Sequence, residues 1–434
     1  MRSNRITTQI AATVVLMLTF SVASQLNSQE PEKPFYLHDG DTVLFYGDSI
    51  TEQQYYSHLV EFYVTTRFPK LHLTFYNAGI GGDTVTGGMA GPIDLRLSRD
   101  VFPRKPTVVT VMLGMNDGRY RPLTPAIESD YVQGFEHLLN SIHQTLPTAR
   151  FTLLGPSPYD EVTRSPMFPA GYNSTLVHFS ELDAELARKH NGTYVDLNAP
   201  FVAALQRGMA SNPLATEMLV PDRVHPEQPA HWFMAEAILK GWNAPAIVSS
   251  VTIDSKKLVP NKTINTVITD MQSENSGLTW TELDEALPLP IEDGNATTHF
   301  LRQITDVEEQ LNQQPLKVLG LAPAIYELTI DSNTIGKFNS EELASGINLA
   351  DYNTPMLNQS KTVGWALRDR DYTEFVRLRM YVDQVKNGEA HEKAQSELSD
   401  FSATQLKHIH EIAQPKTHKF QLKLVPAVEL GKPN

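Results

Sequence analysis

The sequence predicts an α/β fold built around a parallel β-sheet. Three short runs rich in β-branched and aromatic residues, 42–46, 71–76 and 107–113, are each followed by a glycine within three residues. Such runs are typical of buried strands. Helical patterns of apolar residues follow at 131–146 and 175–189. Strands that alternate with helices in this way favour a parallel sheet with helices on both faces.

The predicted sheet explains how residues far apart in sequence come to share one site. Weaker strand patterns lie at 150–154 and 193–197, and further helical patterns lie at 55–64 and 230–239. In an open parallel sheet, ligands bind beyond the carboxyl ends of the strands. Ser49, Gly82 and Asn116 each lie a few residues past a predicted strand. We therefore expect three separate loops to bring them to one edge of the sheet.

Length and composition limit the classes of protein that this chain can be. With 434 residues it is long enough for two domains and a sizeable core. Its formal net charge is −14, and no cluster of lysine and arginine offsets that acidity. Sequence-independent nucleic-acid binding relies on such cations, so we expect no nucleic-acid partner. The chain has no cysteine, which excludes disulfide bonds and a lipid-anchoring cysteine.

The N-terminus has the pattern of a cleavable signal peptide. Arg2 and Arg5 precede the apolar stretch 10–20, and small residues follow at Ala23 and Ser24, near which we expect cleavage. The apolar stretch is well short of the roughly 20 residues that span a bilayer, so a membrane anchor is the weaker interpretation. We expect export to the periplasm or the medium, and no stable membrane span. Loss of two arginines and no acid gives the mature chain −14 − 2 = −16.

Ser49 follows the first predicted strand and precedes a helical pattern. A helix N-terminus offers free N–H groups and the positive end of a dipole, and both suit a developing oxyanion. Asp and Ser are also common helix N-caps, so Gly47-Asp48-Ser49 alone has a purely structural interpretation. No G-x-S-x-G elbow surrounds Ser49, which disfavours the α/β-hydrolase form of serine chemistry.

Two further loops contain groups that can donate hydrogen bonds to an oxyanion. Gly82 lies in a glycine-rich turn, where a backbone N–H can approach a ligand closely. Asn116 offers an uncharged side-chain amide. A plain tight turn and an Asn-Asp turn are the alternative interpretations of these segments. No Lys-Ser or Lys-Thr pair follows the glycines, so a phosphate-binding loop is disfavoured.

Asp222 and His225 supply the remaining parts of a serine hydrolase. A nucleophilic serine needs a base, and the base needs a partner that orients it. Asp222 lies three residues before His225, so its carboxylate can bind Nδ1 while Nε2 faces the serine. Pro226 fixes the exit of this loop. An accidental pair in a surface loop is the alternative interpretation.

The other histidines lack a comparable context. We expect surface or core positions for His58, His178, His190 and His231. His408 and His410 precede Glu411, but no ligand follows at the spacing of a zinc helix. We therefore predict neither a metal site nor a bound cofactor.

Four segments, taken in order, resemble the conserved blocks of the SGNH (GDSL-type) hydrolase superfamily. They are Gly47-Asp48-Ser49-Ile50-Thr51, Asn77-Ala78-Gly79-Ile80-Gly81-Gly82-Asp83-Thr84, Gly114-Met115-Asn116-Asp117 and Asp222-Arg223-Val224-His225-Pro226. One departure is Met115, where Gly or Ala is commoner in the family. The resemblance covers about residues 40–243. It implies a flavodoxin-like three-layer α/β/α domain with a parallel sheet, and ester hydrolysis without a cofactor.

The resemblance also assigns roles to the residues that match its blocks. It implies that Ser49, Asp222 and His225 are catalytic, and that Ser49, Gly82 and Asn116 form the oxyanion hole. We therefore predict an exported serine esterase that cleaves carboxylic esters through an acyl-enzyme. Small-molecule or polysaccharide esters are the expected substrates, with O-acetyl esters of carbohydrates favoured. The alternatives are a lysophospholipase or thioesterase, and a non-catalytic carbohydrate-binding protein on a hydrolase scaffold.

The chain divides by composition into five segments. These are a signal peptide (1–24), a linker (25–39), the hydrolase domain (40–245), a β-rich accessory region (246–338) and a helical region (339–434). In the β-rich region we expect strands at 247–253, 263–269, 317–321 and 326–330. Helical patterns follow at 340–350 and 372–386, and in the second Phe375, Leu378, Val382 and Val385 share one face. Either these segments form a separate module, or the late helices return to pack on the hydrolase domain. In the second case loops at 346–350 and 353–356 would border the active site.

Overall fold

A five-stranded parallel sheet forms the centre of the N-terminal half of the protein. The computed structural model describes residues 34–274, 277–291, 296–382 and 388–426. The strands are β1 (Thr42–Gly47), β2 (Thr74–Gly79), β5 (Val108–Met112), β6 (Arg150–Leu154) and β7 (Thr193–Val195), in the spatial order β2-β1-β5-β6-β7. Every neighbouring pair is parallel, so the carboxyl ends of the strands share one edge.

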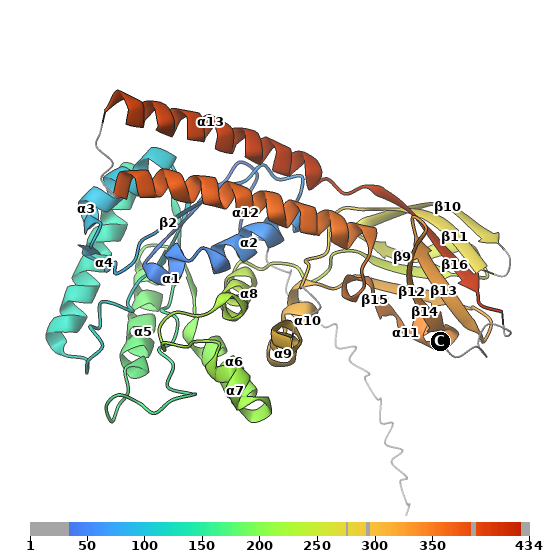
Figure 1. The fold of residues 1–434 in the computed structure, drawn as a ribbon, viewed down its shortest axis with the longest axis horizontal. Helices are drawn as coiled ribbons and strands as arrows, with labels where there is room; N and C mark the ends of the chain where they lie inside the picture. The colour runs from blue at the N-terminus through green and yellow to red at the C-terminus, as the bar shows by residue number, and fades with distance from the viewer. Residues whose placement is uncertain (1–33, 275–276, 292–295, 383–387, 427–434) are drawn as a thin grey trace, which may run out of the picture. The chain divides into compact units, whose positions relative to one another are not determined.

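Helices cover both faces of this sheet, which gives the three-layer α/β/α arrangement that the sequence predicts. Figure 1 shows α4 (Pro125–Thr145) and α5 (Asn173–Lys189) on one side, and α2 (Tyr55–Arg67) and α8 (His231–Gly241) on the other. The sheet is therefore buried on both faces, and every residue of β5 is buried. The shorter elements are α1 (Ser49–Glu52), β3 (Gly87–Gly88), β4 (Gly91–Pro92), α3 (Ile93–Arg96), α6 (Asn198–Ser211) and α7 (Pro213–Glu217), with short non-α helical turns η1 (Leu97–Val101), η2 (Phe102–Arg104) and η3 (Gln228–Ala230).

Element boundaries differ from the sequence prediction where capping chemistry decides them. Helix α4 begins at Pro125, six residues before the apolar pattern, because Thr124 caps it by accepting a hydrogen bond from the Ile127 N–H. Strand β2 begins at Thr74 rather than at residue 71, and it extends to Gly79, where the glycine-rich turn starts. The apolar periodicity located both elements but not their ends.

The C-terminal region contains two more sheets. One has the order β10-β11-β16-β13-β14 and the other β15-β12-β8-β9. Their strands are β8 (Ser250–Asp254), β9 (Val259–Ile264), β10 (Thr266–Glu274), β11 (Gly277–Asp284), β12 (Pro315–Leu319), β13 (Ile325–Ile330), β14 (Asn333–Asn339), β15 (Ile347–Asn348) and β16 (Thr417–Leu424). The helices are α9 (Ala296–Ile304), α10 (Val307–Leu311), α11 (Ser340–Ser345), η4 (Leu349–Asp351), α12 (Pro355–Val382) and α13 (Glu389–Ile412).

Several expectations for the C-terminal region are corrected. The strand expected at 263–269 is two strands, β9 and β10, which belong to different sheets, because Asn265 between them has φ +54° and interrupts the extended backbone. The helix expected at 340–350 ends at Ser345, since Gly346 adopts φ +105°. The next two residues, Ile347 and Asn348, pair with β12 instead, so part of the loop expected at 346–350 belongs to a sheet.

The last part of the chain, expected to be helical, ends in a strand in the middle of a sheet. Strand β16 lies between β11 and β13 and is antiparallel to both. The chain therefore leaves the β-rich region through α12, returns along α13 and closes the sheet with β16 (Figure 1). Val385 and its neighbours at 383–387 lie outside the described residues.

Helix α12 packs on the hydrolase domain through buried polar contacts. The buried guanidinium of Arg370 donates to the Phe75 carbonyl at 3.1 Å and contacts the Glu61 carboxylate at 3.4 Å. Asp371 Oδ2 lies 2.7 Å from His58 Nδ1 on α2. Two residues of α12 thus bind the strand and the helix that follow the Ser49 segment.

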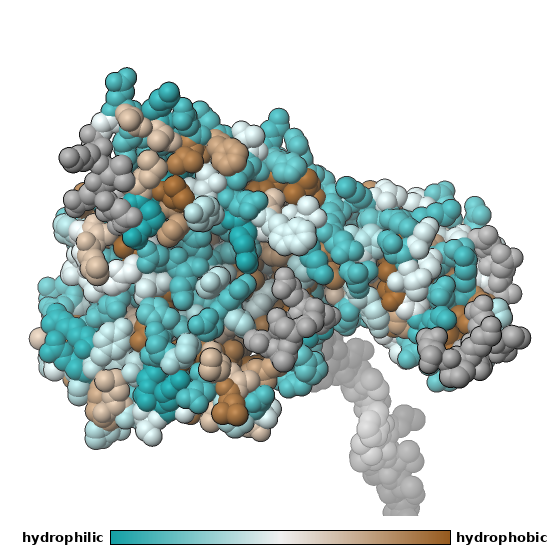
Figure 2. Space-filling view, in the orientation of Figure 1, coloured by the Kyte–Doolittle hydropathy of each residue, from teal (hydrophilic) through white to brown (hydrophobic). Residues whose placement is uncertain are grey.

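The surface shown in Figure 2 is mainly hydrophilic, with hydrophobic side chains in separate spots rather than in one continuous patch. Within the described residues, no helix is both long and apolar enough to cross a membrane.

Candidate active site

Ser49, His225 and Asp222 form a hydrogen-bonded line at the carboxyl edge of the sheet. Ser49 begins α1, directly after β1, and its Oγ lies 2.8 Å from His225 Nε2. His225 Nδ1 lies 2.6 Å from Asp222 Oδ2 on the other side of the ring. With the ring proton on Nδ1, Nε2 is free to accept the serine proton. The structure thus joins a nucleophile, a base and a group that orients the base.

The loop that carries the base is fixed by its own carboxylate. Asp222 Oδ1 accepts hydrogen bonds from the backbone N–H groups of Val224, at 2.9 Å, and of His225, at 2.8 Å. Arg223 between them has φ +72°. Partial burial favours a raised pKa for Asp222, but the bonds from His225 and Val224 outweigh it and lower the pKa below the usual value. The carboxylate therefore stays charged at neutral pH and holds Nδ1–H.

Asn116 presents its amide beside the same edge. Its Nδ2 donates to the backbone carbonyl of Asp83 at 3.0 Å, and its Oδ1 accepts from the Tyr120 hydroxyl at 3.3 Å. A carboxamide nitrogen carries two hydrogens, so one remains for a ligand. The two contacts set the orientation of the amide before a ligand arrives. Tyr120 is a positioning residue that the sequence analysis did not identify.

Gly82 provides the second loop of the site. Its φ of +73° lies in the left-handed region, where a side chain is strained, and the residue is exposed. The turn rests on Asp83, whose buried carboxylate contacts Tyr46 Oη at 3.1 Å and Arg96 Nε at 3.0 Å. Arg96 is fully buried and also donates to the Ala78 carbonyl at 2.8 Å. A buried ion pair therefore lies directly beneath the glycine-rich turn.

Helix α12 also supports the glycine-rich turn, through Glu52. Glu52, the last residue of α1, accepts a hydrogen bond from the Gly81 N–H at 2.9 Å. Its second carboxylate oxygen accepts from Arg379 of α12 at 2.6 Å. The chain Arg379–Glu52–Gly81 links the C-terminal region to the loop that precedes Gly82. No local signal in the sequence pairs residues 327 positions apart.

The comparison with protein families agrees with this geometry. Residues 45–233 match the GDSL-like lipase/acylhydrolase family. This segment is an SGNH (GDSL-type) hydrolase domain. The protein is accordingly a serine hydrolase that acts on ester bonds.

Similar proteins cover either this domain or nearly the whole chain. An acetylxylan esterase of Geobacillus stearothermophilus is 26% identical over 221 residues, which are 46% of this chain and 93% of that protein. A solved gut microbial diltiazem-metabolizing enzyme is 26% identical and covers 91% of this chain and 99% of its own, with a TM-score of 0.76. A solved variant of an acetyl-xylooligosaccharide esterase from Geobacillus is 25% identical and covers 48% of this chain and 96% of its own, with a TM-score of 0.37. The similarity to the diltiazem-metabolizing enzyme therefore extends through the C-terminal region.

Two more acids of the SGNH domain are buried near Ser49. Asp48 caps α1 by accepting from the Ile50 N–H at 3.0 Å, so the N-cap interpretation of this block also holds. Burial raises the pKa of Asp48 to about 7. Burial likewise raises the pKa of Asp117 to about 7, although its carboxylate accepts from the Val85 and Gly114 N–H groups. Neither carboxylate contacts the Ser49–His225 line.

His231 joins the two segments that carry the nucleophile and the base. It is fully buried, and its Nε2 lies 3.1 Å from both Gln53 Oε1 and the Pro226 carbonyl. Burial lowers its pKa to about 3, so the ring is neutral and Nε2–H is the donor. His231 is thus a core histidine, as expected, and it also ties the Ser49 segment to the His225 loop.

No group of three or more metal-binding side chains occurs among the described residues. The ring of His410 on α13 lies 5.7 Å from the ring of His72. This contact packs α13 on the hydrolase domain.

Proposed function

We propose that the protein is an exported carbohydrate esterase that removes O-acetyl groups, with Ser49 as nucleophile. The observation that carries the catalytic part is the line from Ser49 Oγ through the His225 ring to Asp222, with distances of 2.8 and 2.6 Å. It supplies the three groups of a serine hydrolase at the strand edge where ligands bind.

In the proposed reaction, Ser49 Oγ attacks the acyl carbon while His225 Nε2 takes the hydroxyl proton. The proton then passes to the leaving alkoxide, and an acyl-enzyme remains on Ser49. Water, deprotonated by His225, attacks the acyl carbon and releases the acid. Asp222 stays charged throughout and stabilises the imidazolium.

The oxyanion of each tetrahedral intermediate binds the Ser49 N–H, the Gly82 N–H and the free hydrogen of the Asn116 amide. This assignment is supported by the anchored orientation of Asn116 and by the exposed left-handed Gly82. Donors that are already oriented stabilise the developing charge without reorganisation.

The preference for acetyl esters of carbohydrates is supported by the 26% identity to an acetylxylan esterase. It also agrees with the signal-peptide pattern at 1–24, which would bring the enzyme to extracellular polysaccharides. The gut microbial relative is a diltiazem-metabolizing enzyme. Because diltiazem carries an acetyl ester, it serves as a test substrate without a sugar.

The test compares p-nitrophenyl acetate, butyrate and octanoate, and then acetylated xylo-oligosaccharides and diltiazem. We expect the highest kcat/KM on acetyl esters and release of acetate from the oligosaccharides. Ser49→Ala is the matched control, and a fluorophosphonate should label the native protein but not this variant. Preference for octanoate or a lysophospholipid would favour the lysophospholipase alternative. Absence of any turnover would favour the non-catalytic one.

Export is tested separately by expressing the whole chain in a Gram-negative host. The N-terminus of the protein recovered from the periplasm or medium should begin near Ser24 or Gln25. An uncleaved chain that stays in the cytoplasm would contradict export but leave the esterase proposal untouched.

A further inference from the structure

A cavity lies beside the catalytic segments and outside the Ser49–His225 line. It has a volume of about 320 Å³, which is within the range of roughly 300–1,000 Å³ typical of small-molecule sites. Its lining includes Tyr55 and Gln228, so one side is built from the segments that follow Ser49 and His225. The opposite side comes from α12. We refer to it as the Trp232–Trp365 pocket.

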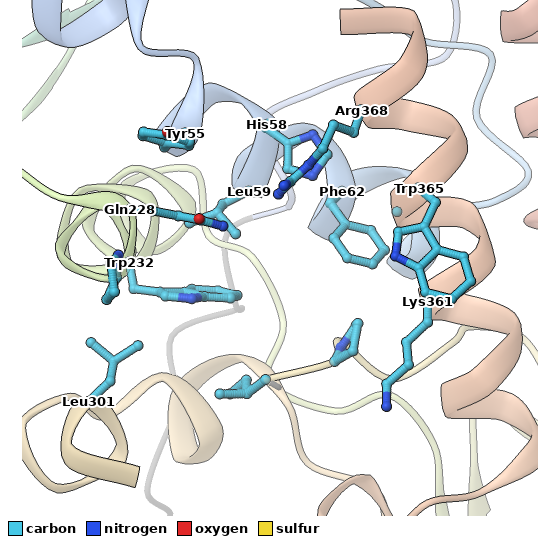
Figure 3. A pocket seen from close by; sticks show the side chains of 14 residues that line it. Tyr55, His58, Leu59, Phe62, Gln228, Trp232, Leu301, Lys361, Trp365 and Arg368 are labelled. Atoms are coloured by element: carbon cyan, nitrogen blue, oxygen red, sulfur yellow. The ribbon is translucent and has the colours of Figure 1, made fainter. Parts of the chain in front are cut away.

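Two tryptophans form walls of this pocket. Figure 3 shows Trp232 on the side of α8 and Trp365 on the side of α12, with Phe62 of α2 between them in this view. Trp365 is 65% exposed, which is high for a residue that normally buries a large apolar surface. An exposed tryptophan on a pocket wall offers its ring face to a ligand. Sugar rings present apolar C–H faces that stack on such a surface.

Two cations lie in the same pocket without an ionic partner. In Figure 3, Arg368 extends from α12 towards His58, and Lys361 lies one turn from Trp365 on the same helix. Within the described residues, neither makes a salt bridge with a carboxylate. The nearby Asp371 is already paired with His58 at 2.7 Å. In a chain of net charge −14, two unpaired cations form a local site for an anion.

We propose that the Trp232–Trp365 pocket binds a uronic-acid residue of an acidic oligosaccharide. The sugar ring stacks on Trp365, and its carboxylate pairs with Arg368. The planar guanidinium of arginine can form two parallel hydrogen bonds with a carboxylate, which a lysine ammonium cannot. Lys361 adds a second positive charge, and the Gln228 amide faces the hydroxyl groups. The inference rests on the proposed function, because it takes the ester substrate to be a saccharide. It specifies an acidic polysaccharide as the class of substrate.

Binding is measured on the full chain with Ser49→Ala, so that no ester is cleaved. The ligands are a glucuronic-acid-substituted xylo-oligosaccharide without acetyl groups and the unsubstituted xylo-oligosaccharide of equal length. We expect the acidic ligand to bind at least tenfold more tightly, and the difference to shrink with salt. Adding Trp365→Ala should raise Kd for both ligands about tenfold, since aromatic stacking contributes on that scale. Adding Arg368→Gln should raise Kd for the acidic ligand only.

Tyr372→Ala is the matched control, because Tyr372 is an aromatic residue of the same helix, 67% exposed and outside the pocket. It should leave Kd unchanged. Thermal unfolding of Trp365→Ala should occur at nearly the native Tm, which shows that the fold is intact. Equal binding of acidic and neutral ligands, or binding of decanoate but of neither sugar, would overturn the proposal. Because the ligands carry no ester, failure of the deacetylase proposal gives a different result, namely oligosaccharide binding without acetate release.

Discussion

The hydrolase domain and the C-terminal region contribute to the active site in different ways. The domain supplies every group of the Ser49–His225–Asp222 line and the Asn116 amide, all from loops at one sheet edge. Among its described residues the C-terminal region supplies no reacting group, but Arg379 holds Glu52, which in turn holds the Gly81 N–H. The match to the acetylxylan esterase covers 46% of this chain, whereas the match to the diltiazem-metabolizing enzyme covers 91%. In this protein Arg379, which lies 327 positions after Glu52 in the sequence, adds a contact that supports the glycine-rich turn.

The largest effect is expected from separating the two regions. A chain that ends at Ala244 loses the carbonyls of Pro245 and Leu311, which accept from the buried Arg67 guanidinium at 2.7 and 2.8 Å. It also loses Arg370, the cation that faces the buried Glu61. Buried charges without partners are strongly destabilising, and the surface that α12 covers becomes exposed. We expect an aggregated or inactive protein, measured by gel filtration and p-nitrophenyl acetate turnover.

Full-length protein prepared in parallel is the control for this truncation. A soluble chain ending at Ala244 with the Tm and turnover of the full-length enzyme would show that the regions are independent. The comparison between a catalytic region and a supporting region would then be wrong.

Replacing the nucleophile tests the first region alone. Ser49→Ala should lower esterase turnover to near background, because no acyl-enzyme can form. The Tm should stay close to that of the native protein, since Ser49 is only partly buried and, among the described residues, its hydroxyl hydrogen-bonds to His225 alone. Turnover and thermal unfolding are measured on the same sample. An active Ser49→Ala enzyme would remove Ser49 from the mechanism.

Replacing the oxyanion donor Asn116 should lower the rate less than replacing Ser49 does, and it should have little effect on substrate binding. Asn116→Ala should reduce kcat by roughly 10²–10³-fold at nearly constant KM, because one preorganised donor stabilises only the transition state. Tyr120→Phe, which removes the hydrogen bond to Asn116 Oδ1, should also reduce kcat, but by a smaller factor. A raised KM at constant kcat would mean that Asn116 binds the substrate in its ground state.

The catalytic blocks were predictable from sequence, and their supports were not. The first three blocks each follow a strand that the sequence indicates, so the strand edge predicts their meeting, whereas the Asp222–His225 block lies in a loop after α7. Glu52 and Arg379 meet only because α12 returns across α2. After α12 the chain runs back through α13 into β16, which completes a sheet that the sequence analysis did not foresee. Its alternation over eight residues is short, and its partners precede it by about a hundred residues or more, so local patterns could not place it.

Removing the remote support should cost less than removing the donor. Arg379→Ala should lower kcat by about tenfold, because the Gly81–Gly82 turn loses part of its positioning, and small displacements reduce rates strongly. Glu52→Gln should act in the same direction, whereas Asp369→Ala, an exposed residue of the same helix, should have no effect. The readout is kcat against KM on p-nitrophenyl acetate. If Arg379→Ala alters only Tm, the C-terminal region stabilises the fold without positioning the turn.

The smallest effect is expected on the pH dependence of stability, and it belongs to the hydrolase domain. Burial raises the pKa of Asp48 from 3.8 to about 7, so between these values the folded protein holds a proton that the unfolded chain releases. The contribution of Asp48 to the free energy of unfolding is therefore greatest below pH 4. It falls as the pH rises towards 7 and stays low above pH 7. Asp48→Asn keeps an acceptor for the Ile50 N–H but cannot ionise. Its Tm relative to the native enzyme should rise by a few degrees between pH 5 and pH 8, with the exposed Asp369→Asn as the control. A constant Tm difference across this range would mean that Asp48 is already ionised at pH 5 and that another group limits stability in alkaline solution.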